Sequence, residues 1–293
     1  MLMVRQRLSV KQLKFIVASK FKSISRQIKR NVFVRDTNRI THVTLRFFMF
    51  FMSFATFKLA IGQNGKEKGQ RTMKKKEKRF WFLGSVFIVA FAIWTVLVQK
   101  VDVQPLGVNG TNIGFATINC WFHKLTGVHM GIYHITDWLG LVPIFVCMIF
   151  GCIGFGQLIK RRSLLKVDCD IILLGIYYII VVFSYLFFEM VPINYRPILI
   201  EGFLKASYPS STTLLVLCVM PTLTERVNRR LENATVKRII NVLAICFSTF
   251  MVLGRLLSGV HWITDIVGSI MLSAGLFCIY KAGVLLCYKV KIR

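Results

Sequence analysis

The chain has 293 residues, of which 55% are hydrophobic, and its mean hydropathy is +0.61. Soluble domains are less apolar, and several runs reach the roughly 20 residues needed to cross a bilayer. The formal net charge of +27 is typical of nucleic-acid-binding proteins, but most of the excess is confined to residues 1–79, which hold 21 basic and 3 acidic residues. We therefore predict an integral membrane protein whose partner is the lipid bilayer, and we exclude nucleic acid.

Residues 1–72 are predicted to form a basic N-terminal extension, separate from a membrane domain at 73–293. Their apolar stretch at 45–61 is interrupted by Lys58, and a polar linker follows at 62–72. The run Met73-Lys-Lys-Lys-Glu-Lys-Arg then directly precedes the first apolar segment, as at an ordinary start of a membrane protein. We expect Met73 to be the native start. The alternative is a membrane-surface arm that binds anionic lipids.

The membrane domain is predicted to be all-α, a polytopic bundle of six transmembrane helices. The expected spans are residues 80–98, 137–159, 169–191, about 210–224, 239–257 and 262–286. The fourth has the weakest pattern, because it is short and contains Pro221. Seven of the eight cysteines lie within or at the ends of these apolar runs, so we expect buried free thiols.

Basic residues fix the predicted orientation. They gather in alternate loops and at the C-terminus, at Lys160, Arg161, Arg162, Lys166, Arg226, Arg229, Arg230, Lys237, Arg238, Lys289, Lys291 and Arg293. The positive-inside rule then places both termini in the cytoplasm, and we expect a multi-pass protein of the cell (inner) membrane. The segments 100–136, 192–209 and 256–262 face outward.

The strongest motif is Arg255-Leu-Leu-Ser-Gly-Val-His261-Trp-Ile-Thr-Asp265. On a helix, residues four apart lie one above the other, so Asp265 can hold one ring nitrogen of His261 and leave the other free to attack. Arg255 supplies a fork of donors suited to a phosphate. Ser258-Gly259 can break the helix between Arg255 and His261. These are the parts of a metal-free phosphate-transferring site.

Two more clusters fall on the same predicted outer side. Tyr208-Pro-Ser-Ser-Thr-Thr213 is typical of a capped helix start, whose exposed N–H groups attract a phosphate. Tyr195-Arg196-Pro197 adds a second arginine.

Together the three clusters resemble the type-2 phosphatidic-acid phosphatase superfamily, whose signature is Lys-x6-Arg-Pro, then Pro-Ser-Gly-His, then Ser-Arg-x5-His-x3-Asp. The third motif matches except that Gly254 replaces serine. The second matches at Pro209 and Ser210, with Ser211 in place of glycine and Thr212 in place of histidine. The first matches at Arg196-Pro197, with Glu189 in place of lysine.

The resemblance implies that His261 is a nucleophile that forms a phospho-histidine, oriented by Asp265. It implies phosphate binding by Arg255 and by Arg196, Ser210, Ser211 and Thr212, with no cofactor and no metal. The family's second-motif histidine protonates the leaving group, which Thr212 does poorly. We therefore expect a polyprenyl diphosphate, whose leaving group is itself a phosphate, to be favoured over a phosphatidic-acid-like monoester.

Substitute residues for the missing groups lie nearby in the sequence. Lys205 is close enough to replace the lost lysine. Candidate auxiliary acids are Glu189, Glu201, His123, His129 and His134. The predicted function is hydrolysis of a membrane lipid phosphate or diphosphate on the extracytoplasmic face. The alternatives are a phosphatase-like protein that binds lipid phosphate without turnover, and a transferase that passes phosphate or a head group to another acceptor.

Overall fold

A computed structural model describes residues 68–291, so the predictions for the extension fall almost wholly outside the described residues. Between these limits the structure is helical, with isolated β-bridges but no β-strand, and the all-α prediction is confirmed. The α-helices are α3 (Lys68–Lys100), α4 (Ala116–Thr126), α5 (Met130–Leu139), α6 (Leu141–Arg161), α7 (Cys169–Met190), α8 (Ser211–Arg230), α9 (Ala234–Leu257) and α10 (Ile263–Lys291).

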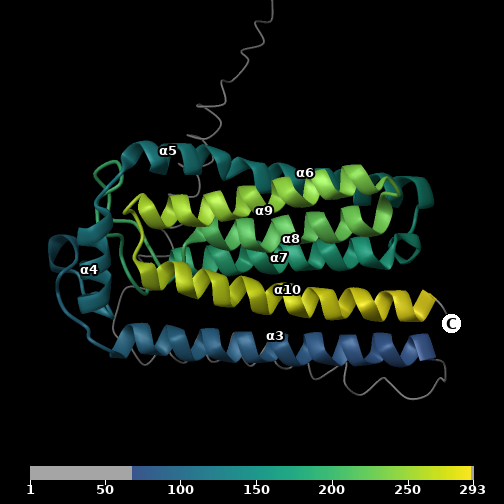
Figure 1. The fold of residues 1–293 in the computed structure, drawn as a ribbon, viewed down its shortest axis with the longest axis horizontal. Coiled ribbons are helices and arrows are strands. Elements are labelled where there is room, and N and C mark those ends of the chain that lie inside the picture. The colour runs from purple at the N-terminus through teal and green to yellow at the C-terminus, as the bar shows by residue number, and fades with distance from the viewer. Residues whose placement is uncertain (1–67, 292–293) are drawn as a thin grey trace, which may run out of the picture. The chain divides into compact units, whose positions relative to one another are not determined.

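Helices α3 and α6 to α10 run side by side, with α10 next to α3 (Figure 1). Two glycines allow the close approach of this pair. A Cβ on Gly84 would lie 2.7 Å from Ile279 Cγ1, and a Cβ on Gly275 would lie 2.8 Å from Ile88 Cδ1. Small residues at such positions let helices in a membrane pack backbone to backbone.

Five helical segments are long and apolar enough to cross a bilayer, and this is a membrane protein. They are Met73–Lys100, Met130–Arg161, Cys169–Met190, Ala234–Leu257 and Ile263–Tyr288. Helix α8 is not among them, so the prediction of six spans is confirmed for five. Helix α8 packs against α6, α7, α9 and α10 and buries the charged residues Glu225 and Arg226. Protein surrounds this helix, which explains why its sequence lacks the apolar pattern of a lipid-facing span.

The segment Met130–Arg161 contains two helices that meet at Gly140. Helix α6 has 21 residues and is about 32 Å long at 1.5 Å per residue. That length already matches the hydrocarbon core of a bilayer, about 30 Å. Helix α5 therefore extends the predicted span of residues 137–159 toward one end of the bundle.

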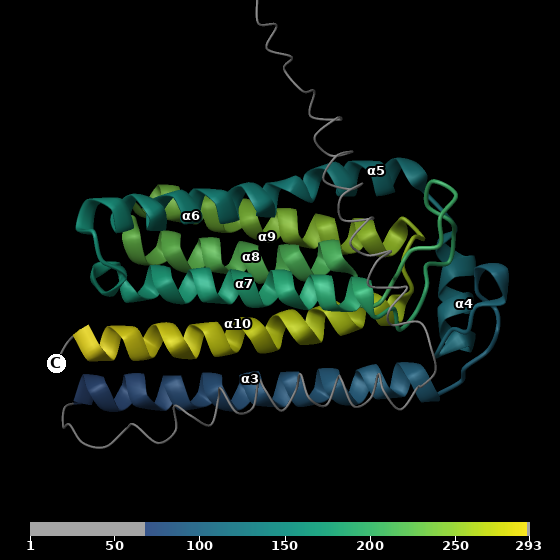
Figure 2. The same cartoon turned by 180° about the vertical axis from the view of Figure 1, so that it is seen from behind.

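The connecting segments sort to the two ends of the helices as the basic residues predict. Helices α4 and α5 gather at one end with the loops at 101–115, 191–210 and 258–262 (Figure 2). The loops at 162–168 and 231–233 lie at the other end, near the C-terminus. We call the first the site end and the second the basic end. Which end faces the cytoplasm stays a prediction.

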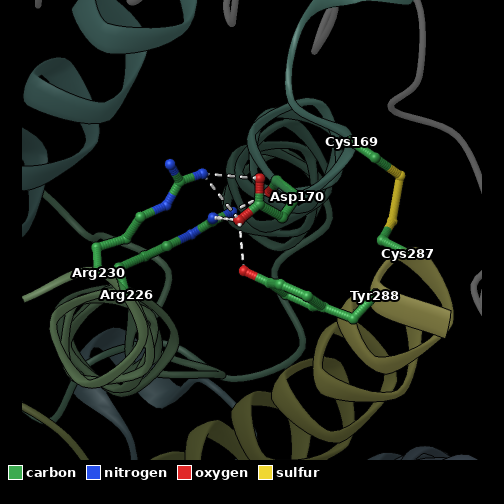
Figure 3. Close-up of a disulfide and its surroundings, with 6 residues drawn as sticks. All are labelled: Cys169, Asp170, Arg226, Arg230, Cys287 and Tyr288. Atoms are coloured by element: carbon green, nitrogen blue, oxygen red, sulfur yellow. Dashed lines mark hydrogen bonds and ion pairs between the residues drawn. A yellow bond between two sulfur atoms is a disulfide. The ribbon is translucent and has the colours of Figure 1, made fainter. Parts of the chain in front are cut away.

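A buried ion pair ties helices together at the basic end. Arg226 donates to both the carboxylate and the backbone carbonyl of Asp170, and the two side chains are 4% and 7% exposed. Arg230 and the Tyr288 hydroxyl each lie 3.2 Å from the same carboxylate (Figure 3). Residues from α7, α8 and α10 thus share one acidic group.

A disulfide next to this cluster joins Cys169, the first residue of α7, to Cys287 near the end of α10 (Figure 3). Their Cα atoms are 6.0 Å apart although 118 positions separate them in sequence. The prediction of free thiols is wrong for this pair, because hydropathy does not reveal which helix ends meet. Among the described residues the other six cysteines are free.

Candidate active site

The turn between α9 and α10 carries His261. Helix α9 ends at Leu257, and Gly259 follows with a φ of 67°. A Cβ on Gly259 would lie 2.1 Å from the Gly127 carbonyl oxygen, so only glycine fits both the conformation and the space. Helix α10 then begins at Ile263. The predicted helix break at Ser258-Gly259 is confirmed, and it leaves Arg255 on α9 and His261 in the turn.

The imidazole of His261 is held by one nitrogen only. Its Nδ1 lies 3.1 Å from the carbonyl oxygen of Ser207, which can only accept, so Nδ1 carries the proton. The Nε2 atom is buried and has no hydrogen-bond partner among the described residues. In this tautomer the lone pair sits on Nε2, as a nucleophile requires.

The carboxylate of Asp265 reaches His261 through an intermediate residue. Its Oδ2 accepts hydrogen bonds from the Ser207 hydroxyl and, at 2.9 Å, from the backbone N–H of Trp262. The distance from Oδ2 to His261 Nδ1 is 3.5 Å, longer than the bond to the Ser207 carbonyl. Because His261 precedes the first residue of α10, the helical four-residue geometry that the sequence predicted does not apply to this pair.

Ser207 is therefore a site residue that the sequence prediction missed. Its backbone N–H donates to the Asn194 carbonyl at 2.9 Å, and its neighbour Ala206 bridges to Tyr195. These contacts close the segment 194–207 into a loop beside His261. Ser207 lies only two residues before Pro209, but nothing in its sequence surroundings distinguishes it from an ordinary loop serine.

Burial and two arginines keep His261 uncharged. Its side chain is 1% exposed, and the loss of solvation lowers the pKa of His261 well below its usual range. The positive charges of Arg196 and Arg255 lower this pKa further. The neutral imidazole is thus available at and below neutral pH.

Arg255 approaches the site from α9 and is 2% exposed. Its Nη2 donates to the Thr212 hydroxyl at 2.6 Å and lies 3.7 Å from Asp137 Oδ1. Its guanidinium carbon stands 5.1 Å from the centre of the Tyr133 ring. Its Nε is buried without a partner among the residues described.

Arg196 approaches from the loop that carries Ser207. Its Nε donates to the Ala206 carbonyl at 3.2 Å, and its backbone N–H donates to the Lys205 carbonyl at 3.1 Å. Within the described part of the chain, its buried Nη1 has no partner. The Lys205 side chain lies 3.5 Å from Glu201, so this lysine is engaged in an exposed ion pair.

The predicted phosphate-binding residues at the start of α8 have different surroundings. The Ser210 side chain pairs with Thr213, and its backbone N–H donates to the Asp265 carbonyl, so Ser210 fastens α8 to α10. Ser210 makes no side-chain cap to the first turn of α8. Ser211 lines a small cleft beside His261, and Thr212 contacts Arg255.

The candidate auxiliary acids separate in the structure. His123 contacts the Gly259 carbonyl at 3.1 Å, and its ring packs at a tilt against Trp262, so it supports the turn. His129 contacts Thr126 within its own segment, while His134 and Glu201 are exposed. Glu189, at the end of α7, is the member of this group that lines the cleft together with His261, beside Tyr185 and Phe188.

Known proteins resemble part of this chain. No curated protein matches it significantly. A solved structure, the first transmembrane PAP2 type phosphatidylglycerolphosphate phosphatase from Bacillus subtilis, aligns with 72% of this chain and 98% of its own at 16% identity, with a TM-score of 0.49. The family model described as PAP2 superfamily matches residues 188–287, from the end of α7 to the end of α10. This stretch holds Arg196, Arg255, His261 and Asp265, so the match to the PAP2 superfamily model falls where the three motifs predicted it.

Proposed function

We propose that the protein is a membrane phosphatase that removes phosphate from a lipid phosphate or diphosphate through a phospho-histidine on His261. One observation carries the proposal: three buried nitrogen atoms without partners among the described residues belong to three side chains that act electrostatically on one another. They are His261 Nε2, Arg196 Nη1 and Arg255 Nε. An unpaired buried donor costs about 1–3 kcal/mol. A phosphoryl group would satisfy two donors and meet one nucleophile.

The chemistry follows from the positions of these atoms. Nε2 of His261 attacks phosphorus while the arginines neutralise the equatorial oxygens. The proton stays on Nδ1, where it is hydrogen-bonded to the Ser207 carbonyl, and the nearby Asp265 carboxylate stabilises the positive charge that develops on the ring. The uncapped first turn of α8 offers further N–H donors for an anion. Water then releases phosphate from His261.

The preferred substrate in this proposal is a polyprenyl diphosphate. The Thr212 hydroxyl is too weak an acid to protonate a leaving group, and its oxygen already accepts a hydrogen bond from Arg255. A phosphate leaving group needs no proton from the enzyme, whereas an alkoxide does. The lipid tail would stay in the bilayer while the head group enters the site end on the extracytoplasmic face. In this arrangement α8 crosses the membrane as the sixth span.

The same Thr212 contact favours a second candidate, a protein that binds lipid phosphate without hydrolysing it. Such a protein would keep the arginines and the buried imidazole but lack a group that completes turnover.

A phosphate-release panel on the purified full-length chain tests these candidates. The substrates are phosphatidate, phosphatidylglycerol phosphate and a polyprenyl diphosphate, with wild type, His261→Ala and the matched exposed carboxylate variant Glu232→Gln. We expect fastest release from the diphosphate, loss of release in His261→Ala, and activity that survives EDTA. Faster cleavage of a monoester than of the diphosphate would contradict the proposed substrate preference. Binding of a lipid phosphate without phosphate release would favour the non-catalytic candidate. Inhibition by EDTA that Mg²⁺ restores would contradict the metal-free mechanism.

A further inference from the structure

A carboxylate outside all three motifs lies against the phosphate-binding arginine. Asp137, near the end of α5, places Oδ1 3.7 Å from Arg255 Nη2. That same nitrogen donates to Thr212 at 2.6 Å. Asp137 and Thr212 therefore meet on one corner of the guanidinium group, although 75 positions separate them in the sequence.

Gly254 permits this meeting. A Cβ on Gly254 would lie 2.7 Å from Thr136 Cγ2, too close for any side chain at that position without a shift of α5. The absence of a side chain at 254, where the superfamily motif has serine, thus brings α5 against α9 beside Arg255.

Asp137 is accessible to solvent, unlike the arginine, histidine and aspartate of the third motif. Its side chain is 44% exposed, whereas those of Arg255, His261 and Asp265 are 2%, 1% and 0% exposed. Asp137 is therefore a water-accessible carboxylate beside the arginine that would hold the phosphoryl group. A carboxylate is a suitable base for an attacking water.

On the basis of the proposed function, we propose that Asp137 is the general base for the second half of the reaction. The Asp137 carboxylate takes one proton from water as the water oxygen bonds to phosphorus. The bond between phosphorus and His261 Nε2 breaks, and its electron pair returns to Nε2. Phosphate leaves, and Asp137 then releases its proton to bulk water.

Charge sets a second expectation for this residue. A negative carboxylate close to Arg255 opposes the binding of a phosphate at the same guanidinium group. Removal of the charge from Asp137 therefore leaves KM unchanged or lowers it while kcat falls. Loss of a residue that merely shaped the phosphate site would raise KM instead.

The test separates the two half-reactions in the full-length protein with a polyprenyl diphosphate labelled with ³²P on its terminal phosphate. Rapid-quench single turnovers measure acid-labile phosphoenzyme formation and decay for wild type, Asp137→Asn, Asp137→Glu and the control Glu232→Gln. In Asp137→Asn we expect normal formation, at least 10-fold slower decay, and a matching loss of kcat without a rise in KM. Asp137→Glu retains part of the decay rate.

Two results would overturn the assignment: wild-type decay in Asp137→Asn, or loss of phosphoenzyme formation in that variant. If wild type forms no phosphoenzyme and releases no phosphate, the proposed function itself fails, and this inference fails with it. Gly254→Ser provides an independent check. Displacement of α5 from Arg255 is expected to slow phosphoenzyme decay in the same way, and unchanged decay in a folded Gly254→Ser protein would contradict the placement.

Discussion

The Ser207 hydroxyl donates a hydrogen bond to the Asp265 carboxylate, and the Ser207 carbonyl accepts a hydrogen bond from His261 Nδ1–H. One residue thus links the acid and the imidazole through both its side chain and its backbone. The Asp265 carboxylate can still stabilise charge on His261 across 3.5 Å, while the Ser207 carbonyl fixes the ring. The orientation of the nucleophile depends on the loop 194–207 as much as on the Arg-His-Asp motif.

Ser207→Ala tests the contribution of the hydroxyl group. The variant keeps the hydrogen bond from Nδ1–H to the backbone carbonyl. It leaves the buried Asp265 with one hydrogen bond fewer, which removes about 1–2 kcal/mol of stabilisation. We expect kcat to fall about 10-fold with little change in KM, measured by steady-state phosphate release. Ser248→Ala removes a serine that bonds within α9 and serves as the control. An unchanged kcat in Ser207→Ala would show that the link to Asp265 has no catalytic effect.

The pH dependence of kcat/KM reports the protonation of His261. Because burial lowers the pKa of His261, followed by the charges of Arg196 and Arg255, the reactive neutral form persists as the pH falls below about 6.5. The acid limb from this group therefore lies below that value. Arg196→Gln removes one repelling charge, so we expect the limb to move to higher pH as overall activity declines. A limb that stays in place or moves lower would contradict this account of the electrostatics.

Gly268→Ala tests how closely α10 approaches the loop that holds Ser207. A Cβ at this position would lie 2.7–2.8 Å from the ring atoms of Tyr208, which is buried and hydrogen-bonded to Thr95. We expect a loss of about 1–3 kcal/mol of stability in detergent, together with lower activity. Gly175→Ala, on α7 with open space around it, is the matched control. Equal melting temperatures for the two variants would contradict the close contact.

Arg226→Met tests the buried ion pair at the basic end. The change leaves Asp170 with Arg230 and Tyr288 but without its buried partner. Breaking a buried pair from one side typically costs about 3–5 kcal/mol. The exposed pair Arg161–Asp168, at 2.9 Å, provides the comparison, because Arg161→Gln should cost at most about 1 kcal/mol. Unfolding curves in SDS measure both, and similar losses would refute the difference in burial.

The sequence predicted the fold where lipid dictates composition. Apolar runs of bilayer length identified five spans, since a lipid-facing helix must be apolar along its length. Helix α8 was the weakest prediction, because neighbouring helices surround it and it has no need of an apolar surface. Arg226 illustrates this. Its charge predicted a position in a cytoplasmic loop, but in the structure its side chain is buried against Asp170.

The site was predictable only where its residues share a short motif. Arg255, His261 and Asp265 lie within 11 positions, and the turn at Gly259 was visible between them. Ser207 and Asp137 were not predicted, because a backbone carbonyl acceptor has no residue signature and Asp137 lies on a distant helix. Its placement depends on the missing side chain of Gly254, which the sequence marked only as a departure from the motif.

The disulfide between Cys169 and Cys287 turns the basic end into an indicator of sidedness. Basic loops are expected in the cytoplasm, whereas disulfides persist in oxidising compartments. The basic loops and the disulfide lie at the same end of the protein but predict opposite sides of the membrane. The thiol state of Cys169 in native membranes therefore decides between the two orientations. A reduced pair agrees with cytoplasmic basic loops and an outward site. An oxidised pair, resistant to reductant from the cytoplasmic side, would indicate the opposite orientation, with the basic end outside and the site facing the cytoplasm.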